Sequence, residues 1–181
     1  MMPALLEPEE LQKMPDGDSY ELIDGVPTEK KPMGAKSDFT GAALIGLVKP
    51  YCRQHKLGLV FGSQAGYRCF PDKPLQVRIP DVSFVASGRL PDDQPPDGYI
   101  AIVPDLVVEV ASPNDGYEEI QSRVADFQSA KTRLIWVVSP HTRTVLVRRL
   151  DGSCAELRED GELSGEDVIP GFRCKVAELF T

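Results

Sequence analysis

The chain has 181 residues, a formal net charge of −8 and a sequence pI near 4.8. A chain of this length builds one domain of ordinary size with a substantial core. Because non-specific DNA affinity comes mostly from Lys and Arg side chains that neutralise phosphates, the acidic balance argues against a surface that coats DNA broadly. A local basic rim is compatible with an acidic protein, and the candidates for it are Lys30, Lys31, Lys36, Lys49 and Arg53. Scattered charges such as these more often form a solvated face.

The cysteines and the N-terminal stretch indicate the compartment. The four cysteines lack the paired spacing that binds zinc or carries redox chemistry, which favours reduced thiols. The first residues show no basic region followed by a long apolar run, and no window approaches membrane-spanning length. We therefore expect a cytoplasmic protein without membrane association.

The first half of the chain predicts helix, hairpin, helix and then strands. A short helix is expected from Glu7 to Met14, and a hairpin from Tyr20 to Glu29 turns at Asp24-Gly25, a strong turn dipeptide. Apolar residues at helical spacing predict a long helix from Ser37 to His55. The strands that follow are expected at Leu59–Phe61, Gly66–Phe70, Val77–Ala86 and Leu106–Ala111.

The second half predicts one more helix and more strands. Ile120, Val124 and Phe127 form the apolar stripe of a helix from about Glu118 to Ala130, and Arg123 falls at the edge of that stripe, facing the sheet. Strands are expected at 134–138 and 144–150, followed by a meander that ends at 176–180. This order indicates an α/β or α+β fold, with a central mixed sheet flanked by helices and preceded by the N-terminal helix and hairpin.

Glu109 is the residue that points most directly to function. It lies in the run Asp105 to Ser112, which is otherwise apolar on both faces and is typical of a strand in the middle of a sheet. A buried carboxylate needs a cation, a metal or several donors to replace its water. Asp81 holds a similar place in the strand expected at Val77–Ala86, so two acids on neighbouring strands would begin a metal site.

Two interpretations of these acids remain open from the residues alone. Two strand-borne carboxylates beside a cation suit metal-assisted phosphodiester hydrolysis, in which a hard divalent cation activates water and the protein cation steadies developing charge. The alternative is a structural salt bridge between the buried acid and an arginine such as Arg123, because structural ion pairs produce the same pattern.

Four segments resemble the Uma-two family of restriction-endonuclease-like proteins, formerly a bacterial domain of unknown function. They are Tyr20–Gly25, Pro80–Ser83, Pro104–Pro113 and the stretch from Arg123 to Val138, and the likeness spans about Pro8 to Phe180. That family is similar to the PD-(D/E)XK nuclease superfamily, which implies a single restriction-endonuclease-like domain over residues 1–181. The resemblance implies that Asp81 and Glu109 ligate magnesium or manganese, that Glu21 is a further acid near the site, and that Arg123 is the catalytic cation.

The chain departs from the superfamily pattern at the motif lysine. The residue two positions after the second acid is Ala111, and the position to which the family's lysine has moved is Arg123. Lys36 and Ser139 stand where the family usually has a histidine and an acid. Arginine stabilises charge but does not readily deprotonate, so this replacement predicts slow catalysis.

Two functions follow. The first is a magnesium-dependent hydrolase that cuts DNA phosphodiesters, weakened by Arg123; the second is an inactive member that acts as a dimeric binding or interaction module. An open cleft above Asp81 and Glu109 would favour the enzyme, and a direct bridge from Arg123 to Glu109 that seals the cleft would favour the module. We also expect a homodimer, from the family resemblance and because the apolar strands between Leu134 and Leu150 could form a subunit edge.

Overall fold

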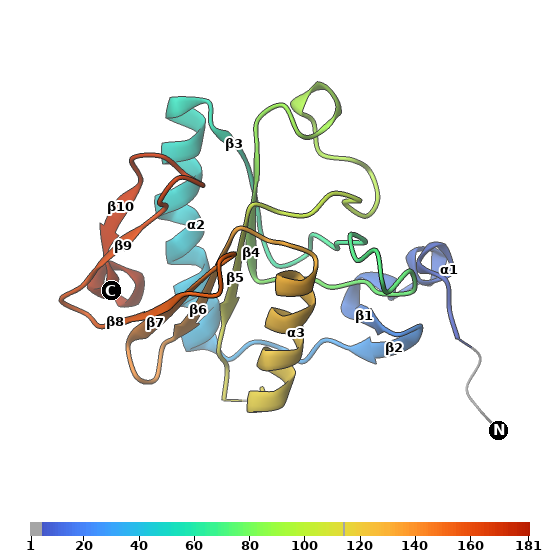
Figure 1. Ribbon diagram of the computed structural model, residues 1–181. Coiled ribbons are helices and arrows are strands. Elements are labelled where there is room, and N and C mark those ends of the chain that lie inside the picture. Colours follow the sequence, from blue (N-terminus) through green and yellow to red (C-terminus); the bar gives the residue numbers. More distant parts are fainter. Residues whose placement is uncertain (1–4, 114) are drawn as a thin grey trace.

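The computed structural model describes residues 5–113 and 115–181. Its centre is a six-stranded mixed sheet with the order β3-β4-β5-β6-β7-β8 (Figure 1). Neighbouring strands are antiparallel except β5 and β6, which run parallel and are joined through a helix, as parallel pairs require. The strands are β3 (Gly58–Phe61), β4 (Val82–Ala86), β5 (Leu106–Val110), β6 (Leu134–Ser139), β7 (Thr144–Arg149) and β8 (Cys154–Leu157).

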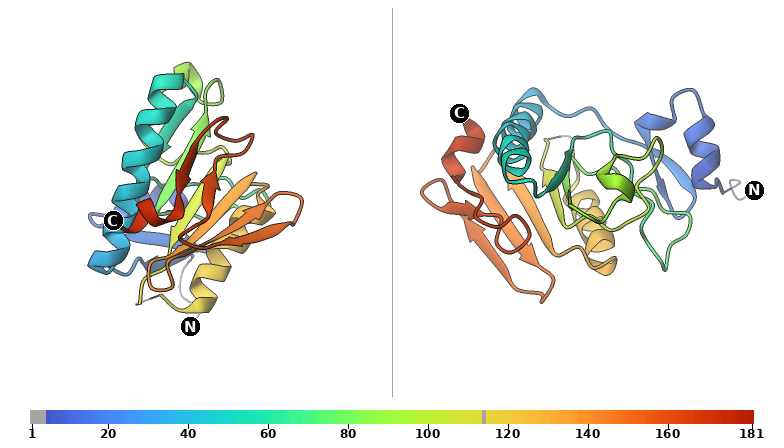
Figure 2. Two further views of the ribbon diagram at one scale, coloured as in Figure 1. Left: turned by 90° about the vertical axis from the view of Figure 1, so that its left-hand side faces the viewer. Right: turned by 90° about the horizontal axis from the view of Figure 1, so that it is seen from above.

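Two helices cover opposite faces of this sheet, as Figure 2 shows from above. Helix α2 (Ala35–His55) packs with the C-terminal segment over one face, and helix α3 (Tyr117–Ser129) packs over the other. Because side chains alternate along a strand, β5 contributes Val108 and Val110 to the α2 side and Val107 to the α3 side. Both faces of β5 are therefore buried, which explains its nearly continuous apolar sequence.

The N-terminal segment forms a separate small layer beside α3. It contains α1 (Pro8–Lys13), the 3-10 turn η1 (Gly17–Ser19) and the antiparallel hairpin of β1 (Tyr20–Ile23) and β2 (Val26–Glu29). A small apolar cluster of Leu11, Leu22 and Val77 joins this layer to the loop before β4. The remaining elements are η2 (Pro91–Asp93), β9 (Glu162–Ser164), β10 (Arg173–Lys175) and η3 (Val176–Phe180).

The predicted fold class is confirmed, with three local corrections. Gly66–Phe70 is not a strand, because its backbone forms only isolated bridges, centred on Tyr67, to Arg78 and Ile100. The strand expected from Val77 begins at Val82, since Pro80 has no amide hydrogen to donate to a ladder. The strands between Leu134 and Leu150 do not end at a sheet edge, because β8 covers β7. The expectation that these strands form a subunit edge is therefore wrong, and the homodimer itself stays a prediction.

Within the described residues, no helix is both long enough and apolar enough to cross a membrane.

Candidate active site

The register of β4 and β5 brings the two predicted acids together. These strands are antiparallel, and Val82 pairs with Val108. One step further along the same register, Asp81 comes opposite Glu109. The amide of Val110, the residue after Glu109, donates to Asp81 Oδ2 at 2.7 Å and so holds Asp81 against β5. Asp81 thus lies one residue before β4 rather than within it, and Glu109 lies within β5.

Glu109 is buried on the α3 side of the sheet, and its two carboxylate oxygens differ in their hydrogen bonding. Its side chain is 2% exposed, and Oε2 accepts a hydrogen bond from Arg123 Nε at 2.8 Å. The other oxygen, Oε1, has no hydrogen-bond partner among the described residues. Burial raises the pKa of Glu109 to about 8, because loss of hydration and the nearby Asp81 outweigh the lowering effect of Arg123 and Lys30. Glu109 is therefore an incompletely compensated buried acid.

Arg123 projects from α3 toward the sheet, as its position on the helix predicts. Besides Glu109, its Nη2 contacts Asp115 Oδ1 at 3.5 Å. Burial lowers the pKa of Arg123, but the surrounding carboxylates, with Glu109 foremost, outweigh burial and raise that pKa above its usual range. Arg123 thus stays a cation at any working pH and contributes charge rather than proton transfer.

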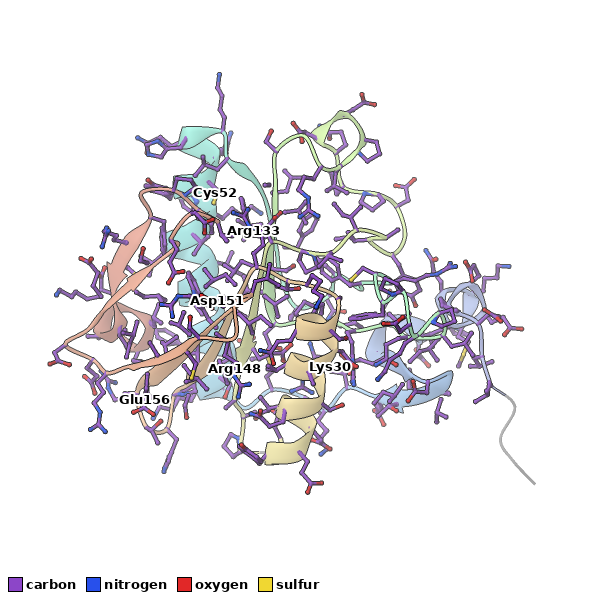
Figure 3. All side chains as sticks on the ribbon, viewed as in Figure 1. Lys30, Cys52, Arg133, Arg148, Asp151 and Glu156 are labelled. Carbon is purple, nitrogen blue, oxygen red and sulfur yellow. The ribbon has the colours of Figure 1, made fainter. Side chains whose placement is uncertain are left out.

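Asp81 is bound by a second cation, Lys30, which follows β2. Lys30 Nζ lies 3.3 Å from Asp81 Oδ1, 2.9 Å from the carbonyl oxygen of Ile79 and 3.5 Å from that of Ser63. Asp81 is 6% exposed and Lys30 17%. In Figure 3, Lys30 lies between α3 and the β1–β2 hairpin. We refer to Lys30, Asp81, Glu109 and Arg123 as the Glu109 site.

Glu21 lies nearby but belongs to a different ionic cluster. Its Oε2 accepts from Arg78 Nη1 at 2.8 Å, and its Oε1 accepts from the Ile79 amide at 2.8 Å. Arg78 is 2% exposed and also donates through Nε to Asp126 Oδ2 at 2.7 Å and through Nη2 to Ser122 Oγ at 2.9 Å. We refer to Glu21, Arg78, Ser122 and Asp126 as the Arg78 cluster.

A cavity of about 110 Å³ lies over both groups. Asp81, Arg123, Glu21 and Arg78 all contribute to its wall. Glu109 is not part of the wall and lies behind Arg123. The structure therefore combines both features that would distinguish the two functions: a hollow beside Asp81, and a direct bridge from Arg123 to Glu109.

The two acids of the Glu109 site are compatible with a divalent metal. Magnesium is commonly held by one or two carboxylates together with water and substrate phosphate. Among the described residues, Glu109 Oε1 has no hydrogen-bond partner and Asp81 Oδ1 has one, the longer contact to Lys30, so both oxygens could ligate a metal. Among the described residues, no group of three or more His, Cys, Asp or Glu side chains could hold a metal, so the fit rests on two protein ligands.

Four residues predicted from the sequence lie in this region of the structure, and two further charged residues of the region, Lys30 and Arg78, were not predicted as site residues. Asp81, Glu109 and Arg123 meet at the junction of β4, β5 and α3, and Glu21 lies on the adjacent cavity wall. Lys30 was only a candidate for the basic rim, because its pairing with Asp81 spans 51 positions and follows no local spacing. Arg78 gave one signal, a charged residue among buried apolar neighbours in the segment before β4.

The chain is an α+β protein with a six-stranded mixed sheet, a helix on each face and two acids at the β4–β5 junction. A solved structure from Anabaena variabilis, titled as a "putative nuclease belonging to DUF820", matches with a TM-score of 0.81. The match covers 98% of each chain at 20% identity, which shows a shared fold. The Uma2 family model, described as "Putative restriction endonuclease", matches residues 8–177, so the chain belongs to that family. A search of curated proteins found no match.

Proposed function

We propose that this chain is a metal-dependent DNA endonuclease whose magnesium or manganese ligands are Asp81 and Glu109. The observation that carries the proposal is the position of the two acids at the β4–β5 junction, where the Val110 amide donates to Asp81. Glu109 Oε1 is buried there without a hydrogen-bond partner among the described residues, behind Arg123, which lines the cavity. Family membership supports hydrolysis of DNA. When bound, the metal would activate water and neutralise charge on the scissile phosphate.

The residues of the chain have distinct roles in this proposal. Asp81 and Glu109 present oxygens from a rigid part of the sheet, because β5 is buried on both faces. Arg123 must exchange part of its contact with Glu109 for the phosphate, where it supplies electrostatic stabilisation only. Because Arg123 does not transfer a proton as a lysine at this position could, we expect cleavage to be slower than in an enzyme with that lysine. Proton transfer by a side chain contributes roughly 10²- to 10⁴-fold in rate.

Plasmid cleavage in magnesium and in manganese tests the proposal. Wild type should convert supercoiled DNA to nicked or linear forms, and Glu109→Gln should not, because the amide loses the charge that holds the metal. Glu156→Gln on the edge strand β8, exposed and outside the site, is the matched control and should cleave like wild type. Cleavage that survives Glu109→Gln contradicts the proposal.

The direct bridge from Arg123 to Glu109 at 2.8 Å favours a second candidate, an inactive binding module. In that case Arg123 and Glu109 would form a buried structural ion pair, and the protein would not cleave DNA. This candidate would be supported if wild type cleaves DNA with neither metal and if wild type and Glu109→Gln bind DNA equally well.

We also predict a homodimer in solution, as the family resemblance implies. The sheet edges available for pairing are β3 and β8. Light scattering should give twice the mass of the chain, which is 19.9 kDa. A monomer at high protein concentration would contradict this prediction.

A further inference from the structure

The fold leaves one face of helix α2 exposed to solvent. Leu44, Val48 and Cys52 bury the opposite face in the core. Both views of Figure 2 place α2 at the margin of the molecule. The exposed face carries Phe39, which is 52% exposed. A single exposed aromatic ring is common on protein surfaces, so its neighbours on the helix decide whether it belongs to an interface.

A hollow of about 600 Å³ lies over the C-terminal half of this face. Its wall is formed by residues of α2: Ile45, Gly46, Lys49, Pro50, Arg53 and Gln54. A Cβ at Gly46 would meet no atom within 4 Å, so no contact within the described residues requires glycine at this position. Glycine inside a helix nevertheless lowers the stability of the helix relative to alanine. The hollow therefore has room for a side chain from another molecule.

Two opposite charges on the exposed face of α2 form no ion pair with another described residue. Asp38 lies in the first turn of α2 and Arg53 in its last turn, and both are exposed. At 100° per residue they lie about 60° apart around the helix, so they share one side of it. Their separation along the helix axis is about 22 Å, which is too far for contact within one chain. A partner helix that runs in the opposite direction would bring such charges together.

We propose that the exposed face of α2 binds a second copy of this chain, with the two α2 helices antiparallel about a two-fold axis at Gly46. The proposal rests on the homodimer predicted above and not on DNA cleavage. Residues equally distant from Gly46 then lie opposite each other, so Phe39 of one copy meets Arg53 of the other. Phe39 fills the hollow, and the Arg53 guanidinium covers its ring and pairs with Asp38, one residue away. By symmetry each contact occurs twice.

The distribution of charge along α2 favours a second copy over other partners. Asp38 lies at one end of the exposed face, and Lys49 and Arg53 lie toward the other. An antiparallel copy places opposite charges together at both ends. DNA phosphates would be attracted by Lys49 and Arg53 but repelled by Asp38, and a uniformly acidic helix would leave Asp38 beside like charge. The face is thus complementary to itself.

Sedimentation equilibrium over a range of protein concentrations tests the interface. Arg53→Glu should raise the dissociation constant of the dimer by about tenfold or more, because two ion pairs become like-charge pairs. Phe39→Ser should raise it as well, since the hollow loses its occupant. Arg158→Glu makes the same change of charge at a side chain that is 79% exposed and follows the edge strand β8. It is the matched control and should leave the dimer intact.

An exchange of charges completes the test. Asp38→Arg alone should also weaken the dimer, whereas Asp38→Arg combined with Arg53→Glu puts opposite charges back at each contact and should return the dissociation constant toward the wild-type value. A residue needed only for the fold of one chain would not be rescued in this way. Far-UV circular dichroism checks that every variant keeps its helices.

The outcomes separate the interface from the homodimer itself. A wild-type dimer that survives either Arg53→Glu or Phe39→Ser would overturn the α2 interface and leave the homodimer standing. Equal weakening by Arg158→Glu, or a charge exchange that stays as weak as the single variants, would do the same. A monomeric wild type would overturn the homodimer and this interface together, whatever the result of plasmid cleavage.

Discussion

The Glu109 site and the Arg78 cluster are neighbouring groups of buried charges that share one cavity wall, and they differ in how completely their hydrogen bonds are satisfied. In the Arg78 cluster, each guanidinium nitrogen has an acceptor, and both oxygens of Glu21 have donors. In the Glu109 site, one carboxylate oxygen is buried and has no hydrogen-bond partner in the part of the chain that the structure describes. The satisfied network of the Arg78 cluster holds β1, α3 and the loop before β4 together, whereas the Glu109 site keeps a carboxylate oxygen available for a ligand.

The electrostatics of Glu109 agree with this contrast. Its pKa is raised to about 8, because burial is not fully compensated by Arg123. Incomplete compensation costs stability and is typical of functional sites. We therefore interpret the Arg78 cluster as a structural support and the Glu109 site as the reactive part.

The largest expected effect on stability is that of Arg78→Met. This variant leaves Glu21 without its cation in a buried position and removes two contacts to Asp126, and breaking such a pair costs about 3–5 kcal/mol. Arg123→Met should cost less, about 1–3 kcal/mol, because Glu109 can take up a proton and Asp115 is partly exposed. Urea unfolding measures both, and a larger loss for Arg123→Met would reverse the comparison.

The next effect is a pH dependence that belongs to Glu109. Because its pKa is raised from 4.5 to about 8 on folding, the folded protein holds a proton that the unfolded chain has lost between these values. The contribution of Glu109 to the free energy of unfolding is therefore greatest below pH 4.5 and falls as the pH rises to about 8. Urea unfolding across this window should show a steeper decline for wild type than for Glu109→Gln. Equal slopes would mean that Glu109 ionises normally.

The smallest expected effect concerns Glu21 and metal. If Glu21 acts only through Arg78, Glu21→Gln should lower stability but leave the rise in melting temperature caused by Mn²⁺ unchanged. Thermal unfolding with and without Mn²⁺ measures this directly. Loss of that rise would move Glu21 from the Arg78 cluster into the metal site.

The sequence predicts the fold well where hydrophobic periodicity is strong. The α3 stripe of Ile120, Val124 and Phe127 is buried, and Arg123 faces the sheet as its helical position requires. The sequence fails at Gly66–Phe70, where the chain is extended but makes only isolated bridges, because strand patterns do not distinguish a ladder from a covering loop.

The residues of the site likewise differ in whether the sequence predicts them. Asp81 and Glu109 were predictable because a carboxylate in an apolar strand stands out locally. Lys30 was not, because its contact with Asp81 depends on how the hairpin packs against the loop before β4, a tertiary feature without a sequence period. Local chemistry thus identified the acids, and only the three-dimensional structure identified the lysine beside them.

A Mn²⁺ titration followed by thermal unfolding, comparing wild type with Glu109→Ala, tests the central claim most directly. At a Mn²⁺ concentration one hundred times its dissociation constant, binding to the folded state should add about 2.7 kcal/mol and raise the melting temperature by roughly 5–10 °C in wild type. Glu109→Ala should show little or no rise, because one of the two protein ligands is gone. An equal rise in both proteins would place the metal elsewhere and contradict the account of the Glu109 site.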